Sequence, residues 1–195
     1  MTTGGNPDRT SAAERRLTDC AVPGAFIMIL VLGALLRAWH LNQPGFGTQY
    51  YAAGVMSMLE SWHNFFFNSF DPAGFVSIDK PPLAFWLQAA SAKILGFSGL
   101  SIRLPQVIEG VASIALLYHL VQRRFGRSAG FLAALFLAIT PISVAVDRSN
   151  NTDSCLVLVL LAAALALSTA AESCAAHGRA VEAPPKADFA DHHPS

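Results

Sequence analysis

A short polar stretch, Phe70–Leu83, interrupts an otherwise apolar sequence and carries two carboxylates and one ammonium. Asp71, Asp79 and Lys80 lie within ten residues of one another, and two prolines follow directly. Proline is favoured in the first turn of a helix. The free N–H groups of a helix start attract anions, and a lysine adds a point charge suited to phosphate. The stretch therefore predicts a phosphate contact at Lys80, with Asp79 where a helix cap would lie. A capped helix with a solvated lysine is the open alternative.

A second polar cluster, D-R-S-N-N-T-D, occupies residues 147–153 between two apolar segments. Asp153 lies where the following helix would be capped. Together with Asp71 and Asp79, it could supply a general base or bind a divalent cation. The spacing fixes no particular metal site, and a solvated loop with a helix cap is the open alternative.

The composition indicates that these clusters lie at a membrane. The chain has 195 residues, of which 53% are hydrophobic and 13% charged, whereas soluble domains carry about 25% charged residues. The formal net charge is zero, which gives no electrostatic support for a nucleic-acid partner. We predict an integral membrane protein built from helices, surrounded by a lipid bilayer.

Apolar segments of about 20 residues are long enough to cross the hydrocarbon core as helices. Four segments meet this description and predict transmembrane helices: residues 21–39, 102–122, 128–146 and 154–171. Two further helices, about 49–62 and 82–97, are predicted to lie at the membrane surface; for 49–62, packing on a protein core is equally open. The tails, 1–20 and 172–195, are polar and predicted to be disordered.

Positive charge sets the expected orientation. Arg123, Arg124 and Arg127 form the sharpest basic cluster, and such clusters face the cytoplasm. The loop 123–127 and both tails are then cytoplasmic, while the loops 40–101 and 147–153 lie outside. This arrangement gathers the charged residues of the two outer loops on one face.

Three charged residues lie inside the predicted transmembrane segments. Arg37, near the outer end of the first segment, is expected to snorkel to the interface. Arg103 begins the second segment and is either an interface anchor or a phosphate clamp. Glu109 lies inside that segment, and an intramembrane carboxylate suggests a functional role.

Several short motifs occur in order between about residues 25 and 170. They are Arg37, Pro44-Gly45, Tyr50-Tyr51-Ala52, Asp79-Lys80-Pro81-Pro82-Leu83, Trp86, Arg103-Leu104-Pro105, Arg123-Arg124-Phe125-Gly126-Arg127, Ala129-Gly130, Thr140-Pro141 and Asn150-Asn151-Thr152-Asp153. This order is typical of glycosyltransferase family 39, which the region resembles. The family includes protein O-mannosyltransferases and bacterial aminoarabinose transferases.

The resemblance implies a GT-C fold in the cell membrane, with interfacial helices in the first outer loop. Such enzymes move a sugar from a polyprenyl-phosphate donor to an acceptor outside the cytoplasm, with inversion. The lysine of the K-P-P motif is expected near the donor phosphate, which assigns that role to Lys80. The remaining residues predicted to bind substrate are Tyr50, Tyr51, Asp71, Arg103, Asn150 and Asn151.

The sequence departs from the family in two respects. Many relatives have an acidic pair before the first-loop helix, and its aspartate is the favoured general base. Thr48 and Gln49 stand there in this chain, so the role falls to Asp79 or Asp153, with Asp71 as a weaker substitute. The family also has many more spans, so we expect this chain to be an N-terminal part that works with further membrane helices.

Two function classes other than a complete transferase remain open. One is a truncated, inactive remnant or a partner-binding membrane subunit. The other, a four-span transporter or channel, is the weaker alternative because the predicted spans, Glu109 apart, carry few residues that could line a polar pore.

Overall fold

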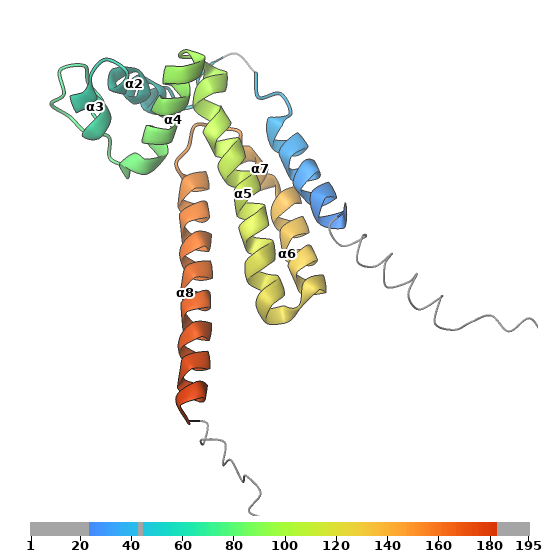
Figure 1. The fold of residues 1–195 in the computed structure, drawn as a ribbon. Helices are drawn as coiled ribbons and strands as arrows, with labels where there is room; N and C mark the ends of the chain where they lie inside the picture. Colours follow the sequence, from blue (N-terminus) through green and yellow to red (C-terminus); the bar gives the residue numbers. More distant parts are fainter. Residues whose placement is uncertain (1–23, 43–44, 183–195) are drawn as a thin grey trace, which may run out of the picture.

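The computed structural model describes residues 24–42 and 45–182, which form helices joined by short loops (Figure 1). The prediction of an all-α fold is confirmed. The described part contains no β-strand, only an isolated bridge between Ser69 and Ser77. The predictions for residues 1–23, 43–44 and 183–195 lie outside the described ranges.

The helices follow the predicted segments with three local differences. In chain order they are the first helix, Gly24–Ala38, then α2, Gln49–Met58, α3, Trp62–Phe66, α4, Pro82–Leu95, α5, Gly99–Phe125, α6, Arg127–Ile139, α7, Pro141–Asp147, and α8, Asp153–Glu182. The predicted helix 49–62 ends early, and α3 begins where Ser61 Oγ accepts the N–H of Asn64. The predicted span 128–146 is divided at Thr140. Residues 172–182 are helical rather than a disordered tail, because alanine and glutamate favour the continuation of α8.

The helix α5 is the centre of the molecule, packing against α4, α6, α7 and α8. Figure 1 shows the first helix and the pair α6 and α7 running toward the end that carries α2–α4, while α5 and α8 run away from it. We call that end the head; it comprises α2, α3, α4, the loops that join them and the loop 148–152. The chain therefore leaves the head through α5, returns to it through α6 and α7, and leaves it again through α8.

Two helices are long and apolar enough to cross a membrane on their own: α5, and the Asp153–Ala175 part of α8. The pair α6 and α7 is a third candidate, bent by 60° at Thr140–Pro141. The first helix is apolar but shorter in its described part, Gly24–Ala38. These helices support a membrane protein, while the count of four spans and their orientation stay predictions.

Two hydrophobic clusters hold the fold together. In the head, Val55 of α2 and Phe85 of α4 are fully buried against Ile102 of α5. Within the long helices, Ile114 of α5 is fully buried against α6, and the first helix packs on this cluster. The face of α2 predicted as either membrane-bound or core thus packs on protein, although Trp62 is 76% exposed.

Two prolines interrupt the helices, and side chains from other helices satisfy the carbonyls they leave free. Proline lacks the N–H that would bond the carbonyl four residues earlier. Pro105 frees the Ser101 carbonyl, which accepts a hydrogen bond of 2.6 Å from the Ser91 hydroxyl of α4. Pro141 frees the Leu137 carbonyl, which accepts one of 3.2 Å from Arg37.

Candidate functional site

Lys80 and Asp153, which belong to the two predicted polar clusters, line the same cavity in the head. Lys80 precedes α4, and Asp153 is the first residue of α8. The cavity has a volume of about 310 Å³. Its lining residues are Lys80, Pro81, Leu83, Ala84, Thr152, Asp153, Cys155, Leu156 and Val159. It therefore offers one ammonium and one carboxylate beside an apolar wall, a combination that suits a phosphate attached to a lipid.

The Lys80 ammonium has a weak partner. Asp79 Oδ2 lies 3.8 Å from Lys80 Nζ, and the two side chains are 67% and 41% exposed. Exposed pairs of this kind contribute little stability, so the ammonium stays available to a ligand. Asp79 does not cap α4, contrary to expectation: Pro81 holds the cap position without a side-chain hydrogen bond. Asp79 is also absent from the lining of the cavity.

The Asp153 carboxylate is oriented by the loop before it. Asn151 Nδ2 donates to Asp153 Oδ2 at 2.9 Å, and Asn151 Oδ1 accepts the N–H of Thr152 at 2.8 Å. A carboxylate in the first turn also interacts favourably with the helix dipole. The side chain is exposed. Asp153 is therefore held in one orientation while its second oxygen can accept a proton or a hydrogen bond.

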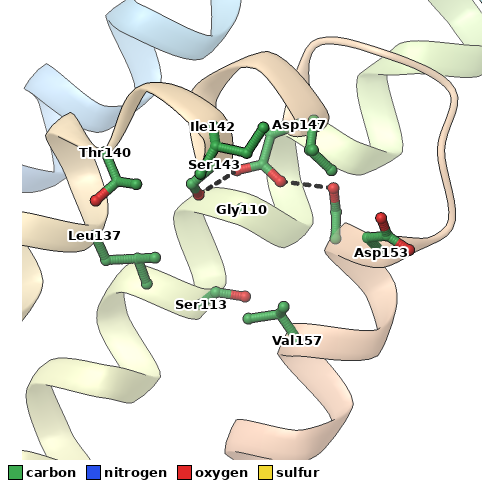
Figure 2. A pocket seen from close by; sticks show the side chains of 11 residues that line it. Gly110, Ser113, Leu137, Thr140, Ile142, Ser143, Asp147, Asp153 and Val157 are labelled. Atoms are coloured by element: carbon green, nitrogen blue, oxygen red, sulfur yellow. Dashed lines mark hydrogen bonds between the residues drawn. The ribbon is translucent and has the colours of Figure 1, made fainter.

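A second cavity, also of about 310 Å³, lies on the other side of Asp153 (Figure 2). It is lined by α5, α6, α7 and α8 through Gly110, Ser113, Leu137, Thr140, Ile142, Ser143, Val146, Asp147, Asp153, Ser154 and Val157. Asp153 is the residue common to the two linings. The start of α8 thus forms the wall between them.

Asp147, which lines this second cavity, forms a buried ion pair with Arg37. Arg37 Nε donates to Asp147 Oδ2 at 2.7 Å, and the side chains are 0% and 6% exposed. Contrary to our expectation, Arg37 does not snorkel to the interface. Its other N–H groups bond the carbonyls of Leu137 and Ala138 and the hydroxyl of Ser143. The guanidinium therefore satisfies the carbonyls at the end of α6 that the break at Pro141 leaves free.

Sequence reasoning missed this pairing because the two residues lie 110 positions apart. It placed Asp147 among the charges of the outer face. The available signal was an arginine inside an apolar segment together with a proline that frees carbonyls in another segment. Both side chains require close helix approach: a Cβ at Gly110 would meet the Asp147 carboxylate and lie 2.7 Å from Arg37 Nε.

Arg103 and Asn150, both predicted to bind substrate, form hydrogen bonds to backbone groups in the structure. Arg103 is 7% exposed and donates to the carbonyls of Leu41 at 3.2 Å and Gly45 at 2.7 Å. Asn150 is fully buried, and its amide pairs with the backbone N–H and carbonyl of Thr48 at 2.8 and 3.0 Å. The Asn150 bonds therefore join the loop 148–152 to the residue before α2, and the Arg103 bonds join α5 to the segment after the first helix.

The remaining predicted substrate residues lie elsewhere in the head. Tyr50 stacks on Phe70 with ring centroids 4.7 Å apart, and Tyr51 packs on Phe85 at 5.3 Å. Asp71 accepts hydrogen bonds from the backbone N–H groups of Val76 and Phe75, and the Val76 bond is the main cause of its lowered pKa. None of these three lines the cavity of Lys80 and Asp153.

Glu109, the carboxylate for which we predicted a functional role, is buried in α5. Glu109 is 3% exposed, and within the described ranges its carboxylate oxygens have no hydrogen-bond partner. It faces an apolar cavity between α4, α5 and α8.

Among residues 24–42 and 45–182, no group of three His, Cys, Asp or Glu side chains could hold a metal ion. The divalent cation that the acidic residues could have bound therefore has no such group of ligands in this part of the chain.

Comparison with known proteins places these residues in a family. The Bacillus subtilis (strain 168) protein named "Putative mannosyltransferase YycA" is 50% identical over 137 residues, covering 70% of this chain and 20% of that protein. "Putative mannosyltransferase YkcB" of the same organism is 44% identical over 137 residues, covering 70% and 19%. The chain therefore spans about a fifth of the length of these curated relatives. No solved structure matches.

The sequence profile of the family described as dolichyl-phosphate-mannose-protein mannosyltransferase matches residues 79–178. The match begins at Asp79, beside Lys80, and includes the whole loop before Asp153. It confirms the resemblance to glycosyltransferase family 39 and agrees with the all-helical membrane architecture. This chain therefore belongs to the dolichyl-phosphate-mannose-protein mannosyltransferase family.

Proposed function

We propose that this chain acts in transferring mannose from a polyprenyl-phosphate donor to a hydroxyl acceptor outside the cytoplasm. The observation that carries the proposal is the shared cavity of Lys80 and Asp153. A cation at one side of an apolar wall suits a lipid-linked phosphate. The family description and the names of both relatives support mannose as the sugar.

The chemistry assigns one role to each charged residue. The acceptor hydroxyl attacks the anomeric carbon from the side opposite the phosphate, which inverts its configuration. Asp153 accepts the hydroxyl proton as the new carbon–oxygen bond forms. The bond from the anomeric carbon to the phosphate oxygen breaks, and its electron pair leaves with the polyprenyl phosphate. Lys80 stabilises the charge that develops on that phosphate, while Asp79, 3.8 Å away, holds the ammonium near it.

The same proposal includes the setting of the reaction. We expect the plasma membrane, with the head outside and the N-terminus in the cytoplasm. The ends of α5 and α6 that carry Arg123, Arg124 and Arg127 lie away from the head (Figure 1), and a basic cluster of this kind favours the cytoplasmic side. Only 11% of the most apolar part of α8 is buried, which favours further membrane helices beside it.

Membranes containing the chain, or the longer protein that includes it, would test transfer from radiolabelled polyprenyl-phosphate mannose. Lys80→Met should lower transfer on the order of a hundredfold through lost charge stabilisation. Asp153→Asn should reduce kcat by about 10² or more because it removes the base. Asp79→Asn should have a smaller effect, since the exposed pair is weak.

Lys93→Met is the matched control, because Lys93 lies in the last turn of α4, away from the cavity. Transfer that survives replacement of Lys80, Asp79 and Asp153 together would overturn the site. Binding of polyprenyl phosphate without transfer by the parent chain would instead favour a partner-binding membrane subunit over a transferase.

A further inference from the structure

The start of α8 is anchored by a hydrogen bond that the proposed chemistry does not use. The Ser154 hydroxyl donates to Asp147 Oδ1 at 2.6 Å, and both residues are buried, at 3% and 4% exposure. Ser154 directly follows Asp153, the proposed base. In Figure 2, two dashed lines from Asp147 mark its hydrogen bonds to the hydroxyls of Ser143 and Ser154.

Asp147 is a firm anchor because its other oxygen is fixed. Arg37 Nε holds Asp147 Oδ2 at 2.7 Å, and the Ser143 hydroxyl reaches the same oxygen at 3.4 Å. Arg37 is in turn bonded to the carbonyls of α6. The chain of contacts therefore runs from the first helix through α7 to the first turn of α8. A hydrogen bond to a buried, ionised acceptor is stronger than one between neutral groups.

We propose that Ser154 is a positioning residue whose bond to the buried Asp147 fixes the start of α8 and so holds Asp153 in the wall between the two cavities. This inference rests on the proposed function for the role of Asp153. The geometric part stands separately, because it concerns where the first turn of α8 lies relative to Lys80 and Leu83.

Two variants isolate the hydroxyl. Ser154→Thr keeps it, whereas Ser154→Val has nearly the same shape as threonine without it, so any packing strain is common to both. Ser168→Ala is the matched control, since the Ser168 hydroxyl bonds only the Leu165 carbonyl of the same helix in the described structure. Helix content and monodispersity in detergent report whether each variant folds.

The first readout needs no activity. With Cys20, Cys155 and Cys174 replaced by alanine, spin labels at Leu83→Cys and Thr152→Cys report the distance across the first cavity. We expect a narrow distance distribution in the parent and in Ser154→Thr and Ser168→Ala, and a clearly broader one in Ser154→Val. An equally narrow distribution in Ser154→Val would overturn the inference.

The second readout is transfer of the lipid-linked sugar. Ser154→Val should lower kcat about tenfold or more at unchanged KM, because a displaced base harms the reaction rather than donor binding, and Ser154→Thr should restore it. A broadened distribution with unchanged kcat would overturn the functional part. Broadening in Ser154→Val from a parent chain that shows no transfer would contradict the proposed function and leave the anchoring of α8 supported.

Discussion

Two acid–base pairs lie in or beside the head of this molecule, and they differ in almost every physical respect. Asp79 and Lys80 are neighbours in sequence, 3.8 Å apart and largely exposed. Arg37 and Asp147 lie 110 residues apart, approach to 2.7 Å and are buried. In the first pair the Lys80 ammonium lines a cavity. In the second pair the charged groups form hydrogen bonds to backbone carbonyls and serine hydroxyls.

The difference separates two uses of charge at a membrane. A buried pair must be fully hydrogen-bonded, since a single unpaired charge in a low-dielectric setting is strongly unfavourable. Such a pair has no capacity left for a ligand. An exposed pair contributes little to stability and can exchange its partner for a phosphate. We therefore assign the buried pair to architecture and the open ammonium to binding.

Removing one member of the buried pair should give the largest effect. Asp147→Ala leaves the Arg37 guanidinium uncompensated, and breaking a buried pair costs about 3–5 kcal/mol. Thermal unfolding in detergent should show a large loss of stability. Lys80→Ala, the corresponding truncation in the open pair, should shift stability by less than about 1 kcal/mol. Equal losses of stability in Asp147→Ala and Lys80→Ala would contradict the distinction between the buried pair and the exposed pair.

A methyl group at Gly110 should disturb the buried pair without removing a charge. The added Cβ would meet the Asp147 carboxylate, and overpacking costs about 1–3 kcal/mol. Gly126→Ala is not a suitable control, since Gly126 has a φ of +87°. Gly24→Ala is suitable, because apart from its chain neighbours and its own helix backbone no atom of the described residues lies within 4 Å of the added group. Gly110→Ala and Gly24→Ala of equal stability would contradict the close approach of α5 and α7.

A pH effect should come from Asp71, in the loop between α3 and α4. Backbone N–H groups, chiefly that of Val76, lower the pKa of Asp71. The stabilisation is then complete above the ordinary aspartate pKa of about 3.9 and is lost as pH falls through the lowered folded-state pKa. The protection factor of the Val76 amide, which is the intrinsic exchange rate at each pH divided by the observed rate, should fall on acidification in the parent. In Asp71→Asn that fall should be absent; an identical acid response would contradict the prediction.

The smallest effect should come from the ion pair at the other end of the molecule. Arg123 Nη2 lies 2.8 Å from Glu172 Oε2, and both side chains are about 40% exposed, at 42% and 39%. Glu172→Gln should change stability by less than about 1 kcal/mol, and added salt should shrink the difference further. A loss as large as that of Asp147→Ala would show that exposure does not separate the pairs.

Local pattern was enough to predict the helices, the two polar clusters and the family. Apolar segments of sufficient length and a proline-marked helix start are properties of neighbouring residues. The joint lining of one cavity by Lys80 and Asp153 is compatible with the predicted topology, which placed both loops on one face. The backbone hydrogen bonds of Arg103 and Asn150 could not be predicted, because their partners are distant in sequence. The Arg37–Asp147 pair was hidden for the same reason.

Chemical labelling of lysine amines tests the central claim most directly, since Lys80 and Lys93 provide signal and control in one molecule. The chain in lipid nanodiscs would be acylated with and without polyprenyl phosphate, and the modified peptides quantified by mass spectrometry. We predict that polyprenyl phosphate slows modification of Lys80 and leaves Lys93 unchanged. Equal rates at Lys80 with and without the lipid phosphate would contradict the assignment of the open ammonium to donor binding.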